Sequence, residues 1–121
     1  MASHPLNLAF RFILELIMLY SIGHWGWMQP ISHNELLGLI LPIVAVSIWG
    51  TFAVKNDPSR SGKASVSIPG VARLLLELFC FGSAVASLLN LGYTTLAIIL
   101  ASLVAIHYAI SYDRLRWLLK Q

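Results

Sequence analysis

The sequence has little charge. Only 11% of its 121 residues are Asp, Glu, Lys or Arg, whereas a soluble domain carries about 25%. Hydrophobic residues make up 58% of the chain, and the mean hydropathy is +0.77. So few charged side chains cannot cover a water-facing surface of this size. The composition therefore excludes an ordinary soluble domain and favours a lipid bilayer as the surroundings.

Several chemical signatures are also missing. Cys80 is the single cysteine, so no intramolecular disulfide can form. There is no nucleophile–base pair, phosphate-binding loop or metal-ligand spacing, and no base-stacking motif. No segment alternates with a period of two, as an outer-membrane barrel strand would. We therefore expect no enzyme activity, no cofactor, no metal site and no nucleic-acid partner.

What the chain does have is four long apolar runs. Each is long enough to cross a bilayer as a helix, which takes ~20 residues. We predict an all-α polytopic membrane protein: a single domain over 1–121, built as a four-transmembrane-helix bundle of two helix hairpins. No basic residue precedes the first run and no cleavage site follows it, so we expect a retained helix. The expected helices are 6–27, 36–54, 69–91 and 94–117, with a polar connector over 55–68.

Basic residues are distributed on one side of this topology. Neither the segment 28–35 nor the turn around 90–94 contains Lys or Arg. Because positive residues favour the cytoplasmic side, we expect both termini and the 55–68 connector to be cytoplasmic. The basic residues that define this side are Arg11, Lys55, Arg60, Lys63, Arg73, Arg114, Arg116 and Lys120.

Two of the apolar runs carry the same charged motif. Arg11-Phe-Ile-Leu-Glu15-Leu16 and Arg73-Leu-Leu-Leu-Glu77-Leu78 each place Arg and Glu four residues apart, which is about one helical turn. Charge inside a span is expensive and usually faces a protein interior or an aqueous cavity. Each motif helix is followed by a return helix. We infer two halves related by an axis along the membrane normal.

The helical rise predicts which residues lie at the same depth. At ~1.5 Å per residue, Glu15 and Glu77 lie about 12 Å or slightly more beyond the starts of their helices. His107 and Trp49 fall at a similar level, whereas Asn7 continues the face of Arg11 and Glu15 and either extends this polar stripe or, as we expect, lies at the membrane interface. Six residues are therefore expected to converge as ligand-binding or relay residues: Arg11, Glu15, Trp49, Arg73, Glu77 and His107.

Four interpretations of this cluster remain open. The Arg and Glu side chains can neutralise one another and hold the helices together. The two Arg side chains can bind an anionic lipid headgroup or a small acid. Alternatively, Glu15, Glu77 or His107 changes charge in a small proton-coupled transporter or channel. The chain can also be an accessory subunit of a membrane complex or a homo-oligomer.

Small residues form a regular stripe on the last predicted helix. Ala97, Ala101, Ala105 and Ala109 are spaced by four, and His107 lies on nearly the opposite side. Because small residues let helices approach closely in lipid, we expect the alanine stripe to face a neighbouring helix.

Several segments together resemble a known family. In order along the chain, they are the Arg11–Leu16 motif, Trp25-Gly26-Trp27, Trp49-Gly50-Thr51-Phe52 and the Arg73–Phe79 segment. The sequence resembles the YrdB-like family of small four-helix bacterial membrane proteins over nearly its whole length. The resemblance implies that fold and a location in the bacterial cytoplasmic (inner) membrane. That family has no known function, so the resemblance implies no activity. Its matching positions are Arg11, Glu15, Trp49, Gly50, Arg73 and Glu77.

A second resemblance is confined to one residue. Small multidrug-resistance transporters are of similar length and carry a Glu in the first helix, as Glu15 is here. Those proteins form antiparallel dimers, which require a weak charge bias. The one-sided Lys and Arg distribution of this chain argues against that arrangement.

Overall fold

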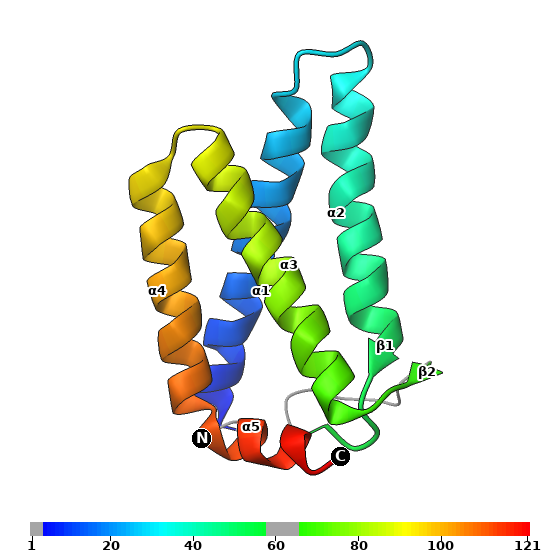
Figure 1. Ribbon diagram of the computed structural model, residues 1–121, viewed down its shortest axis with the longest axis vertical. Helices are drawn as coiled ribbons and strands as arrows, with labels where there is room; N and C mark the ends of the chain where they lie inside the picture. Colours follow the sequence, from blue (N-terminus) through cyan, green and yellow to red (C-terminus); the bar gives the residue numbers. More distant parts are fainter. Residues whose placement is uncertain (1–3, 58–65) are drawn as a thin grey trace.

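The computed structural model describes residues 4–57 and 66–121, and these residues are mostly helical (Figure 1). Their order is α1 (Pro5–Trp27), α2 (Asn34–Thr51), β1 (Phe52–Ala53), β2 (Val66–Ser67), α3 (Gly70–Asn90), α4 (Thr94–Ile110) and α5 (Tyr112–Leu119). The prediction of an all-α fold is confirmed.

Three helices lie close to their predicted positions. α1 and α3 begin and end within one residue of the expected 6–27 and 69–91. α2 ends at Thr51 instead of 54, because Phe52 and Ala53 pair in parallel with Val66 and Ser67. Part of the 55–68 connector, including Arg60 and Lys63, lies outside the described residues.

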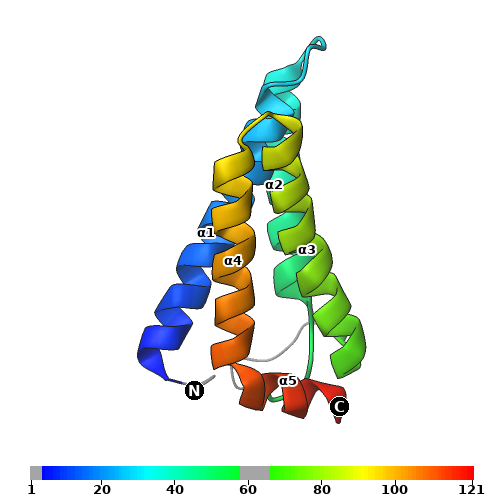
Figure 2. The ribbon, with the colours of Figure 1, turned by 60° about the vertical axis from the view of Figure 1, so that its left-hand side comes forward.

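The fourth helix differs from the prediction. A single helix was expected over 94–117, but the chain turns by 73° at Ser111 and continues as α5. The physical reason is polarity: Asp113, Arg114 and Arg116 place three charges within the eight residues of α5. Arg114 and Leu118 are buried, while Tyr112 and Leu119 are exposed. α5 accordingly lies across one end of the other helices, as both views show (Figures 1 and 2).

The helix lengths are compatible with a membrane. α1, α2 and α3 are each long and apolar enough to cross one, and α4 with α5 makes a fourth such unit if the bent pair is counted as one span. α1 and α3 run in one direction and α2 and α4 in the other (Figure 1). The start of α1 and the end of α5 therefore lie at the same end of the molecule.

Glycines set the distance between α1 and α2. A Cβ atom on Gly26 would lie 2.9 Å from the carbonyl carbon and oxygen of Leu37, one on Gly23 would lie 3.0 Å from the carbonyl oxygen of Gly38, and one on Gly38 would lie 2.8 Å from the Trp27 ring. α2 nevertheless buries a single residue, Trp49, and its outer face is exposed along its length. The apolar core is formed mainly by α1, α3 and α4, with Leu14, Met18, Phe81, Ala84 and Leu100 at its centre.

The alanine stripe of α4 does not pack as predicted. Ala97 is buried, but Ala101, Ala105 and Ala109 are exposed. Ala101 and Ala105 instead line an open groove of about 700 Å³ between α3 and α4. The face of α4 that turns inward carries Val104, His107 and Tyr108, because the two polar side chains find partners there.

Candidate functional site

Glu77 lies at the centre of a buried group of charges. Its side chain has no exposed surface, and its two oxygens accept five hydrogen bonds from four other residues. Oε2 accepts from Arg11 Nη2 at 2.8 Å, from Arg73 Nε at 2.7 Å and from Arg114 Nη2 at 2.7 Å. Oε1 accepts from Arg114 Nη1 at 2.9 Å and from the Tyr108 hydroxyl at 2.7 Å. Thus α1, α3, α4 and α5 meet at a single carboxylate.

Arg73 connects this carboxylate to the end of α2. Its Nη1 donates to the backbone carbonyl oxygens of Trp49 and Phe52, both at 2.6 Å. Its guanidinium carbon lies 4.6 Å from the centroid of the Trp49 ring, and that of Arg11 lies 5.1 Å from it. Such contacts are cation–π interactions. They explain why an indole is buried beside two guanidinium groups.

Arg11 is shared between the two motifs. Its Nε lies 3.3 Å from Glu15 Oε1, one turn along its own helix, while its Nη2 reaches Glu77 on α3. Trp49 Nε1 also donates to Glu15 Oε1, at 3.1 Å. Each Arg therefore pairs within its own helix, and Arg11 pairs with the other half of the repeat as well.

The contacts of His107 define its tautomer. Arg11 Nη1 lies 3.4 Å from His107 Nε2, and a guanidinium can only donate, so Nε2 must accept. The proton is then on Nδ1, which lies 3.2 Å from Asn7 Oδ1. Asn7 Nδ2 in turn donates to the Ser111 hydroxyl at 2.8 Å. A neutral His107 thus begins a hydrogen-bonded chain that ends at the bend between α4 and α5.

Arg114 attaches α5 to the same group. Its Nε and Nη2 donate to the two oxygens of Asp57 at 2.9 and 2.6 Å, a bidentate pair, while Nη1 and Nη2 also reach Glu77. Both Arg114 and Asp57 are buried. α5 is therefore held to α3 and to the connector by one side chain.

These contacts define what we call the ion cluster: Arg11, Glu15, Asp57, Arg73, Glu77 and Arg114. Three guanidinium groups face three carboxylates, so the formal charges balance. A buried ion pair often adds little net stability, but removing one partner leaves an uncompensated buried charge and is strongly destabilising. The ion cluster is therefore well suited to fix how the helices assemble.

All six residues singled out in the sequence lie in or against this ion cluster. Trp49 and His107 contact it, and the other four belong to it. Asp57, Tyr108 and Arg114 were missed. Arg114 counted only as a topology marker, and Asp57 only as a loop residue. Asn7 is buried and bonded to His107 and Ser111, so it extends the polar face of Arg11 and Glu15, while its predicted level at the membrane interface stays a prediction.

Metal binding has no support in the described residues. Within 4–57 and 66–121, no three His, Cys, Asp or Glu side chains gather closely enough to hold an ion.

An all-helical chain of three or four apolar helices with charges buried between them defines a class of small proteins compatible with a membrane. The chain belongs to the family described as proteins of unknown function, DUF2568, which it matches over residues 9–105. It is 40% identical over 116 residues to the uncharacterized protein YrdB of Bacillus subtilis (strain 168), covering 95% of this chain and 94% of that one. No solved structure matches the chain. The family resemblance stated from the sequence is confirmed.

Proposed function

We propose that this protein is a non-enzymatic integral protein of the bacterial cytoplasmic membrane, in which the ion cluster organises the helices and a basic end binds anionic lipid headgroups. The observation that carries the first part is Glu77, a fully buried carboxylate that accepts from guanidinium groups on three helices and from Tyr108 on a fourth. Such a contact holds the helices together only when all of them are in place.

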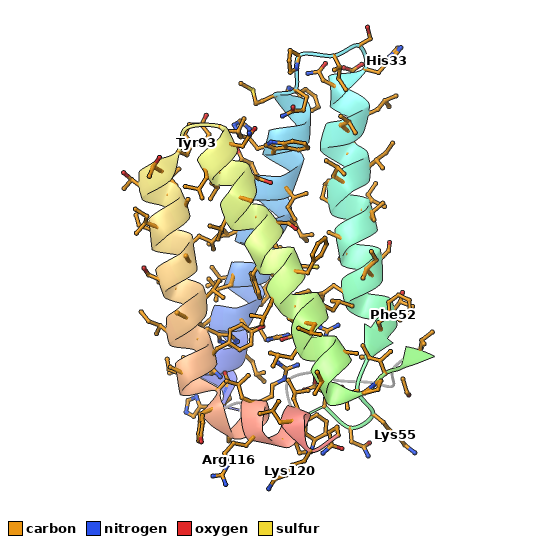
Figure 3. The ribbon with its side chains drawn as sticks, viewed as in Figure 1. His33, Phe52, Lys55, Tyr93, Arg116 and Lys120 are labelled. Atoms are coloured by element: carbon orange, nitrogen blue, oxygen red, sulfur yellow. The ribbon has the colours of Figure 1, made fainter. Side chains whose placement is uncertain are left out.

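The basic end is formed by exposed cations. Lys55, Arg116 and Lys120 lie at the end of the molecule where α5 crosses, whereas His33 and Tyr93 mark the opposite end (Figure 3). Positive residues favour the cytoplasmic side, so we assign this end to the cytoplasm. Tyr112 and Trp117 on α5 suit the membrane–water interface, where amphipathic rings are enriched.

The proposed headgroup site is this basic end rather than the motif Arg side chains. All three guanidinium nitrogens of Arg11 contact Glu15, Glu77 or His107. Arg73 donates to Glu77 and to two backbone carbonyls. An anion at either Arg would have to displace a carboxylate of the ion cluster. Exposed Lys and Arg near an anionic leaflet each contribute about 1 kcal/mol of attraction.

The lipid proposal predicts that a triple variant, Lys55→Gln with Arg116→Gln and Lys120→Gln, binds anionic lipid more weakly than the wild type. Native mass spectrometry in mixed phosphatidylglycerol and phosphatidylcholine should show retained phosphatidylglycerol on the wild type. The triple variant should lose most of that preference, by about fivefold for each cation removed if each contributes about 1 kcal/mol.

Glu35→Gln provides the control, because Glu35 is exposed at the opposite end. It should leave the lipid preference unchanged. Equal phosphatidylglycerol retention by the triple variant and the wild type contradicts lipid binding at this end. If the wild type retains a soluble anion and no lipid, the ligand of the basic end is a small acid and the lipid proposal is wrong.

A small proton-coupled transporter or channel is the second candidate. The observation that favours it is the partial exposure of the Glu15 side chain, which leaves this carboxylate accessible from outside the ion cluster. Glu77 and His107 are enclosed by their partners, so Glu15 is the residue that would exchange the proton. This candidate requires flux in proteoliposomes that falls in Glu15→Gln, and the absence of proton or solute flux in the wild type contradicts it.

A further inference from the structure

The two oxygens of Glu15 have very different surroundings. Oε1 contacts Arg11 Nε at 3.3 Å and accepts from Trp49 Nε1 at 3.1 Å. Oε2 has no hydrogen-bond partner among residues 4–57 and 66–121. The Glu15 side chain is 23% exposed, whereas that of Glu77 is fully enclosed. Glu15 is therefore a carboxylate of the ion cluster with one oxygen left open.

The opening lies on an apolar part of the surface. Phe12, one turn before Glu15, is 58% exposed, and the adjacent Leu16 is 50% exposed. Both positions belong to α1, which is long and apolar enough to span a membrane. A charged oxygen facing hydrocarbon without a donor costs several kcal/mol. A ligand that supplies a hydrogen to Oε2 removes that cost.

We propose that Glu15 is a reversible proton-binding site that is open to the outside of the helix bundle. The proton comes from water at the membrane surface and forms an O–H bond at Oε2, and the same bond breaks when the proton returns to water. This inference goes beyond the organising role of the ion cluster. It requires neither lipid binding nor flux, so it stands or falls separately from both.

The groups that face Glu15 accommodate both forms of its side chain. On its own helix Arg11 already lies closer to Glu77, at 2.8 Å, than to Glu15, at 3.3 Å. Arg11 can therefore turn fully to Glu77 when Glu15 is neutral. From α2, the Trp49 N–H donates to Oε1 of the carboxylate, and it can still donate, more weakly, to the carbonyl oxygen of the acid. From α3, Arg73 and Glu77 remain paired with each other.

Glu77 and His107, the other two residues proposed from the sequence to change charge, have no open atom for a further proton. Both oxygens of Glu77 are occupied, by five hydrogen bonds in total. His107 Nε2 faces an Arg11 N–H, so a second proton on the ring would meet a guanidinium donor. Proton binding is therefore assigned to Glu15 and not shared among the three groups.

Dicyclohexylcarbodiimide tests the proposal on the wild-type protein in lipid nanodiscs. This apolar reagent adds to a protonated carboxyl group, and peptide mass spectrometry locates the adduct. Glu15 should be modified increasingly as the pH is lowered, while Glu77 and Asp57 stay unmodified. Trp49→Phe keeps an aromatic ring but removes the N–H that stabilises the carboxylate at Oε1, and so should move Glu15 modification to higher pH.

Infrared difference spectra give a second readout. The C=O stretch of a carboxylic acid should appear in the wild type over the pH range of carbodiimide modification, and should be missing in Glu15→Gln. The proposal is overturned if Glu15 stays unmodified at every pH at which the protein is folded. It is equally overturned if Glu77 is modified as readily as Glu15, since the open oxygen would then confer no selectivity.

Discussion

Replacing Glu77 with glutamine is expected to destabilise the protein by about 3–5 kcal/mol, the range for removing one partner of a buried ion pair. The variant leaves three guanidinium groups facing two carboxylates, Glu15 and Asp57, inside the protein. The new amide also turns N–H donors toward Arg11, Arg73 or Arg114, which have nothing to accept with. Thermal or detergent unfolding of the purified protein measures the loss.

Two further variants separate the charge of Glu77 from its place in the structure. Glu15→Gln removes the same charge from the ion cluster, but this side chain is partly exposed and uses one oxygen. Its destabilisation should be clearly smaller. Glu35→Gln, which is exposed and outside the ion cluster, should have almost none. If Glu77→Gln unfolds at the same point as Glu35→Gln, the organising role of Glu77 is wrong.

Gly70→Ala is expected to release α5. A Cβ atom at Gly70 would lie 1.8 Å from the backbone carbonyl oxygen of Leu118 and 2.6 Å from its carbonyl carbon. Backbone cannot give way as a flexible side chain does, so α5 must move and carry Arg114 away from Glu77 and Asp57. Overpacking of this kind costs about 3 kcal/mol. Hydrogen exchange should show α5 losing protection while α1 and α2 keep theirs.

Gly82→Ala is the matched control for this change. Gly82 lies on the same helix, α3, but nothing approaches within 4 Å of a Cβ atom there. Because alanine favours helix over glycine by roughly 0.5–1 kcal/mol, this variant should be as stable as the wild type or slightly more stable. Equal protection of α5 in the two variants contradicts the proposed contact between Gly70 and Leu118.

Local patterns predicted the parts of this structure that depend on neighbouring residues. The positions of α1 and α3 follow from the lengths of apolar runs. Pairing within each motif follows from the four-residue helical spacing, and Arg11 and Glu15 do lie 3.3 Å apart. Depth estimated from helical rise also brought Trp49 and His107 to the level of the motifs, where the structure has them.

Contacts between residues far apart in the sequence could not be predicted from local spacing. Arg114 meets a carboxylate 57 residues earlier, and no local spacing links it to Asp57. The break at Ser111 was also missed, because an averaged apolar run conceals three charges at its end. The exposed Ala101, Ala105 and Ala109 show the same difficulty. Spacing identified a stripe of small residues, but the polar partners of His107 and Tyr108 decided which face of α4 turned inward.

The separation of Arg114 from its partners has a consequence for biogenesis. Arg11 and Arg73 each carry a carboxylate one turn away, so α1 and α3 can enter a bilayer with their charges already compensated. Helices that insert independently associate afterwards. Arg114 has its carboxylate partners 37 and 57 residues earlier, so it is synthesised after both of them. A chain that lacked α5 would still carry α1 to α4 but would leave Glu77 without the two N–H donors of Arg114, so we expect proteolytic quality control to remove it faster than the chain that carries α5.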